Sequence, residues 1–169
     1  MKASILAIAL PLFLAQQLNA QHEHSPYVGL ETAEGTTLTP EELQQLRTGD
    51  GMRQALPAEL SQHPGPKHVL ELGDQLGLDE EQRRRIGELF DAMRAEAIRQ
   101  GEEIIVAERH LAQAFRSGDA TPDGVETMTQ RLGSMRGRLQ ATHLVAHLAT
   151  KALLTEEQVS MYDQLRGYR

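Results

Sequence analysis

The fold of this chain is decided by residues 121–151, which read TPDGVETMTQRLGSMRGRLQATHLVAHLATK. Apolar or small side chains recur through this stretch and just beyond it at alternating spacings of three and four. They are Val125, Met128, Leu132, Met135, Leu139, Thr142, Ala146, Ala149 and Leu153. This alternation is the heptad-like seam of a helix that packs along a second helix. Thr121 and Pro122 supply a cap and a first-turn proline, so we expect the helix to begin there.

A second long helix is predicted immediately before this one. Asp79 caps its start, Gln82 stands three residues later as in a capping box, and Gly118 marks its end. Its seam is weak at Gly101 and otherwise consists of Ile86, Phe90, Met93, Ala97, Ile104, Ala107, Leu111 and Ala114. Because the loop 118–121 is short, the two helices must run antiparallel. We therefore predict an all-α fold built on a long antiparallel helical hairpin.

Short helices are expected to flank this hairpin. Thr39 with Pro40 and Pro66 each open one before it, and Thr155 with Gln158 opens one after it. Each long helix carries one apolar stripe, and a lone hairpin leaves much of that stripe in water. A homodimer is an economical way to cover the remainder, so we expect one.

The first residues of the chain have the pattern of an export signal. Lys2 precedes an apolar run at residues 5–14, and the small residue Ala20 offers a cleavage point. The run is shorter than the ~20 residues that span a bilayer. We assign residues 1–20 to a signal peptide, 21–37 to a flexible polar arm and 38–169 to the helical domain. The mature chain is expected to lack a transmembrane span.

Composition excludes several classes of function. The chain has 169 residues and a net charge of −7, which argues against a nucleic-acid partner because phosphates require a basic face. It has no cysteine, and therefore no disulfide, thiolate ligand or cysteine nucleophile. It contains no glycine-rich phosphate loop, no nucleophile elbow and no His-Glu-x-x-His motif. We expect a protein that is not an enzyme and requires no cofactor.

Two of the predicted helix starts share a sequence pattern. Each has a leucine, a capping Asp or Thr, two acidic residues and a glutamine. The matching positions are Leu78, Asp79 and Gln82 in the first copy and Leu154, Thr155 and Gln158 in the second. The pair resembles the duplicated LTxxQ signature of the periplasmic Spy/CpxP family, within a superfamily that includes heavy-metal-resistance and metal-sensing proteins. The first copy departs from that signature at Asp79, although aspartate caps a helix equally well.

The resemblance implies an activity and a compartment. Members of the family are thin helical dimers in the periplasm that hold unfolded envelope proteins without ATP. It therefore implies a periplasmic chaperone or envelope-stress protein, including a role in heavy-metal resistance. A periplasmic metal-binding sensor is the alternative, and a structural dimer without a client is a third interpretation.

Histidines supply the candidate metal ligands. His143 and His147 are four residues apart on one helix and can share a zinc, copper, nickel or cobalt ion. Their offset from the seam predicts a position on its flank for His143 and one further out for His147. Two solvent-exposed histidines on a polar flank are the alternative to a metal site. Glu108 is too near the loop to supply a third ligand within the hairpin. His22 and His24 at the mature N-terminus form a second candidate group.

Overall fold

The computed structural model of the chain describes residues 35–51 and 53–168. Its helices are α1 (Pro40–Thr48), α2 (Leu56–Glu59), α3 (Pro66–Glu71), α4 (Glu80–Ser117), α5 (Pro122–Lys151) and α6 (Glu156–Leu165). No strand occurs in these residues, so the all-α prediction is confirmed for them. The predicted signal peptide, the cleavage point near Ala20 and the arm up to residue 34 lie outside the described residues.

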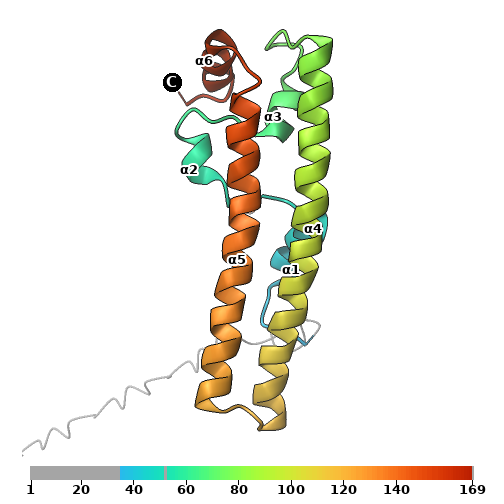
Figure 1. Cartoon of the computed structure of the whole chain (residues 1–169), viewed down its shortest axis with the longest axis vertical. Helices are drawn as coiled ribbons and strands as arrows, with labels where there is room; N and C mark the ends of the chain where they lie inside the picture. The colour runs from blue at the N-terminus through green and yellow to red at the C-terminus, as the bar shows by residue number, and fades with distance from the viewer. Residues whose placement is uncertain (1–34, 52, 169) are drawn as a thin grey trace, which may run out of the picture.

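Helices α4 and α5 pack side by side as a long antiparallel hairpin (Figure 1). The turn between them begins at Gly118, whose φ of 78° is left-handed and favours glycine. The Thr121 side chain then caps α5 by accepting from Gly124 N at 3.2 Å. We call this end of the hairpin the tip. The base is the opposite end, where α4 begins, α5 ends and α6 follows.

Helix α1 packs across the middle of α4 at the position where the predicted seam is weak. A Cβ atom at Gly101 would lie only 2.2 Å from the backbone oxygen of Leu46. Glycine therefore allows the two backbones to touch. The buried cluster around this crossing consists of Leu38, Leu43, Leu46, Ala97, Ile104, Ile105, Leu132, Met135 and Leu139. The weak turn in the pattern is thus a close helix crossing.

A second buried cluster fills the base. It consists of Val69, Leu76, Leu78, Ile86 and Tyr162, which come from α3, the segment after it, α4 and α6. Because α6 folds back onto the start of α4, the end of the helical domain meets the beginning of the hairpin here. The C-terminus lies at this end of the hairpin in Figure 1.

Packing already begins just before the predicted domain boundary at residue 38. Thr36 is buried, and Arg116 Nη1 donates to Gly35 O at 3.2 Å. In the part of the chain that the structure describes, no helix has the length and apolar character needed to cross a bilayer. The homodimer stays a prediction.

Candidate functional site

The two repeated motifs form the helix caps that the sequence predicts. At the start of α4, Asp79 accepts from Gln82 N at 2.7 Å, and Gln82 Oε1 accepts from Asp79 N at 3.2 Å. At the start of α6, Thr155 and Gln158 make the same pair of bonds at 3.2 and 3.0 Å. Both motifs are therefore capping boxes, and Asp79 caps in the way that Thr155 does.

Packing then joins the two motifs through their glutamines. Gln82 Nε2 donates to Gln158 Oε1 at 2.9 Å, and Gln158 Nε2 donates to Gln82 Oε1 at 3.0 Å. Each amide also donates to a backbone oxygen beside the other motif, Gln82 to Leu153 O at 2.9 Å and Gln158 to Leu76 O at 3.3 Å. We call this reciprocal arrangement the glutamine clasp. It uses both ends of each side-chain amide, which only glutamine or asparagine can offer.

The motif leucines support the clasp from the apolar side. Leu78 is buried in the base cluster, and Leu154 is partly buried against the same cluster. The two copies of the motif are therefore in direct contact, although they are far apart in the chain. The sequence predicted each cap but not the contact between them.

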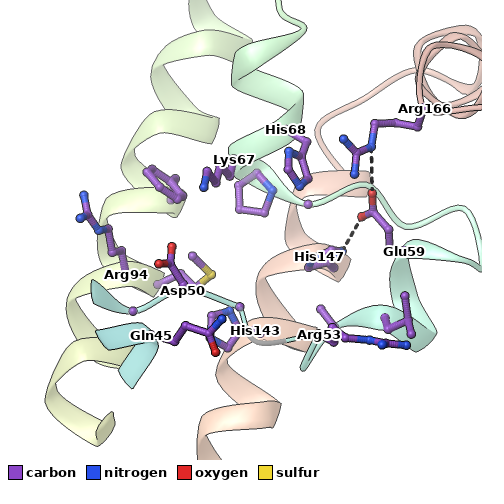
Figure 2. A pocket seen from close by; sticks show the side chains of 18 of the residues that line it. Gln45, Asp50, Arg53, Glu59, Lys67, His68, Arg94, His143, His147 and Arg166 are labelled. Carbon is purple, nitrogen blue, oxygen red and sulfur yellow. Dashed lines mark ion pairs between the residues drawn. The ribbon is translucent and has the colours of Figure 1, made fainter. Parts of the chain in front are cut away.

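A pocket of about 690 Å³ lies beside α5, between the hairpin and the segment that carries α1, α2 and α3 (Figure 2). His143 and His147 line it from α5, while Phe90, Met93 and Arg94 line it from α4. Its remaining walls include residues around α2 and the start of α3. The pocket exists because the short helices cover a second face of α5, beside the one that packs on α4.

His143 is 3 % exposed, so the alternative of a solvent-exposed histidine on a polar flank is wrong for this residue. The apolar seam shows only which residues of α5 face α4. The coil near Gly51 covers another side of α5, where His143 lies. Within the described residues, the buried Nε2 atom of His143 has no hydrogen-bond partner. Burial, and to a smaller extent the neighbouring His147, lowers the pKa of His143, while Asp50 opposes this shift. The imidazole is therefore neutral near pH 7.

His147 also faces inward, and its side chain is only 12 % exposed. Its Nδ1 atom lies 2.7 Å from His63 O, a contact that is a hydrogen bond when Nδ1 carries the proton. The ring packs directly on Gly65, where a Cβ atom would come within 2.7 Å of Nε2. A position far out on the flank, as the sequence suggested, is therefore wrong for His147 as well.

Glu59, which the sequence pattern does not mark, connects α2 to the C-terminal residues. Its Oε1 atom accepts from Tyr162 at 2.5 Å and from Tyr168 at 3.1 Å, and it lies 3.6 Å from Arg166 Nε. Its Oε2 atom lies 3.6 Å from His147 Nδ1 and has no hydrogen-bond partner among the described residues. Burial and the bond to Glu59 raise the pKa of Tyr162. Nothing local in the sequence marks this glutamate, because its partners lie about a hundred residues away.

The positions of His143 and His147 neither confirm nor contradict the predicted metal site. In residues 35–51 and 53–168, no three His, Asp or Glu side chains are grouped so that they could hold one ion. Glu108 pairs with Arg136 at 2.7 Å and is no third ligand to His143. His22 and His24 lie outside the described residues. Binding of zinc, copper, nickel or cobalt at His143 and His147 stays a prediction.

A separate apolar groove of about 470 Å³ follows the α4–α5 seam. Leu89 and Ala92 line it from α4, and Ala141 and Val145 line it from α5. Val145 is 61 % exposed there. Since Phe90, Arg94, His143 and His147 line the pocket instead, the groove lies on the side of the seam away from the short helices.

Comparisons with protein-family models, with curated proteins and with solved structures found no match to this chain.

Proposed function

We propose that this chain is a periplasmic, ATP-independent chaperone or envelope-stress protein related to the Spy/CpxP family. The observation that carries the proposal is the glutamine clasp. Gln82 and Gln158 occupy corresponding positions in the two motifs and bind each other reciprocally at the base of a long hairpin. A chance pair of capping sequences has no reason to meet in this way, whereas a duplicated motif with a shared structural role does.

The apolar groove supports the client-binding part of the proposal. A strip of apolar surface along a rigid helix pair can hold extended apolar segments of an unfolded chain without a specific sequence. Leu89, Ala92 and Val145 offer such a strip, and Met93 adds an adaptable side chain. Formation of a homodimer would either cover this strip or place two of them side by side.

The test is suppression of aggregation without ATP. An unfolded client protein is diluted from denaturant into buffer with the mature chain, and light scattering is followed. We expect wild type to lower the scattering and Val145→Asp to lose most of that effect, because a buried carboxylate opposes apolar binding. Leu165→Asp is the matched control, since Leu165 is an exposed apolar residue of α6 outside the groove. Absence of any suppression by wild type would remove the chaperone proposal.

Export and dimerisation require their own measurements. N-terminal sequencing of the chain from the periplasmic fraction should find a start near residue 21. Sedimentation equilibrium should give twice the mass of the mature chain. A full-length chain retained in the cytoplasm would contradict the compartment, and a monomer at high concentration would contradict the dimer.

A periplasmic metal-binding protein is the second candidate. It is favoured by the presence of His143 and His147 in one pocket. Calorimetry with Zn²⁺, Cu²⁺, Ni²⁺ and Co²⁺ should then give heat that the double variant His143→Ala/His147→Ala loses. Equal heat from wild type and the double variant would exclude these ligands.

A further inference from the structure

The pocket beside α5 gathers positive charge in an acidic protein. The chain has a net charge of −7, yet the charged side chains of this pocket are Arg53, Lys67, Arg94 and Arg166 against Asp50 and Glu59. Positive side chains around a concave surface raise the local potential and attract anions. The excess is therefore a property of this site and not of the whole molecule.

The two carboxylates of the pocket are already engaged within the protein. Asp50 Oδ2 accepts from the Thr48 hydroxyl at 2.6 Å, and Glu59 Oε1 accepts two phenol hydroxyls beside Arg166. Bonds from neutral hydroxyls leave both carboxylates charged, so the four cations of the pocket exceed its carboxylates by two.

Lys67 and Arg94 are two of the pocket's cations that remain available. Lys67 makes no ion pair or side-chain hydrogen bond with the rest of the described chain, and Arg94 uses only Nε, which donates to Thr48 O at 3.1 Å. Figure 2 shows Arg94 on the opposite side of the view from Glu59. Lys67 and the terminal nitrogens of Arg94 can therefore receive an anionic group without disturbing the contacts of Glu59.

The pocket also has an apolar wall. Leu56, Pro66, Phe90 and Met93 line it with carbon. His143 lines the pocket too, but its Nε2 atom is buried from solvent and is not offered to a ligand. A ligand that suits these walls has an apolar body and a negatively charged group.

We propose that this pocket binds an amphiphilic organic carboxylate. Its carboxylate lies between Lys67 and Arg94, and its hydrocarbon part packs against Phe90 and Met93. The volume of about 690 Å³ is within the usual range of roughly 300–1,000 Å³ for small-molecule sites. The inference rests on the cations of the pocket and uses no metal, although Met93 also lines the apolar groove.

The experiment compares two probes that share a hydrocarbon tail and differ in charge. Calorimetric titration of the mature chain with sodium decanoate, below its micelle concentration, should show saturable binding. Decyltrimethylammonium, with the same tail and a positive head, should bind at least about tenfold more weakly, a factor that corresponds to a single well-placed charge interaction. Equal affinity for the two probes would overturn the proposal, and so would the absence of saturable decanoate binding.

Two variants locate the site. Lys67→Gln should weaken decanoate binding several-fold, whereas the matched control Lys151→Gln, which lies outside the pocket, should bind as wild type does. Arg94→Gln removes the second cation and should also weaken binding, with circular dichroism confirming the fold. If Val145→Asp abolishes binding while Lys67→Gln and Arg94→Gln do not, decanoate occupies the apolar groove and the proposal is wrong.

Discussion

The two ends of the hairpin are stabilised in different ways. At the base, side chains from α2, α3, α4 and α6 meet, and Tyr162 and Val69 are fully buried. At the tip, α4 and α5 face each other with an added bond from Arg116 to Gly35 O, and Phe115 is 61 % exposed. The base depends on contacts between residues far apart in the chain, while the tip depends on local caps such as Gly118 and Thr121.

A second difference, between the two sides of the α4–α5 seam, separates two functional surfaces. The pocket with His143 belongs to the half of the molecule where the short helices cover the hairpin, so its walls come from several elements and are held in place. Surfaces that belong to the hairpin alone, such as the apolar groove, have no such cover. A defined ligand site is expected in the first environment and an adaptable client surface in the second.

The largest expected effect comes from replacing one aromatic residue at each end. Tyr162→Ala should lower the free energy of unfolding by about 3–5 kcal/mol, since it empties the base cluster. Phe115→Ala at the tip should change it by less than about 0.5 kcal/mol, because the ring is mostly in water already. Urea unfolding followed by circular dichroism measures both. Similar losses for the two variants would contradict the distinction between the ends.

The glutamine clasp is tested by a change that keeps the caps. Gln82→Glu retains an oxygen to accept from Asp79 N but loses the amide donor to Gln158 and Leu153 O. We expect a loss of about 1–3 kcal/mol because partly buried partners are left unsatisfied. Gln130→Glu is the control, since Gln130 bonds only to Glu126 on the exposed surface of α5. If both variants unfold at the same urea concentration as wild type, the clasp adds nothing to the caps.

The burial of His143 predicts that the free energy of unfolding depends on pH through this side chain, which lies away from the tip. Its pKa is lowered in the folded state, so below the ordinary histidine value of about 6.5 the unfolded chain binds a proton that the folded chain does not. Its contribution to stability is therefore complete above that value and decreases as the pH falls toward the folded-state pKa, by at most about 1.4 kcal/mol per pH unit. Urea midpoints at pH 7.5 and 5.5 should differ less for His143→Phe than for wild type. An identical pH difference in the two proteins would show that other groups cause it.

The smallest expected changes in stability come from replacing either of two glycines of the hairpin. Gly118→Ala should cost about 1–2 kcal/mol because φ is 78° at the tip turn. Gly133→Ala should instead stabilise α5 by up to about 1 kcal/mol, because no atom lies within 4 Å of the added Cβ. Thermal unfolding of the two variants should therefore shift in opposite directions. A gain for Gly118→Ala would mean that the turn adopts another backbone geometry.

Much of the secondary structure was readable from local signals. The starts of α4, α5 and α6 are encoded in the short-range caps Asp79, Thr121 and Thr155, which bond to backbone three residues away. The α4–α5 seam was readable because a helix that packs on one neighbour repeats its apolar positions. The same reasoning failed for His143 and His147, since periodicity describes one packed face and these residues face a second one.

The candidate sites likewise depend partly on local sequence and partly on tertiary contacts. Sequence alone determined that the chain forms an all-α hairpin with two matching caps, because each of those features depends on residues within one or two helical turns. Only the tertiary structure decided that Gln82 meets Gln158, that Glu59 meets Tyr162 and that α1 crosses α4 at Gly101. Those contacts join residues separated by many tens of positions, and no local pattern records which distant segments will pack together.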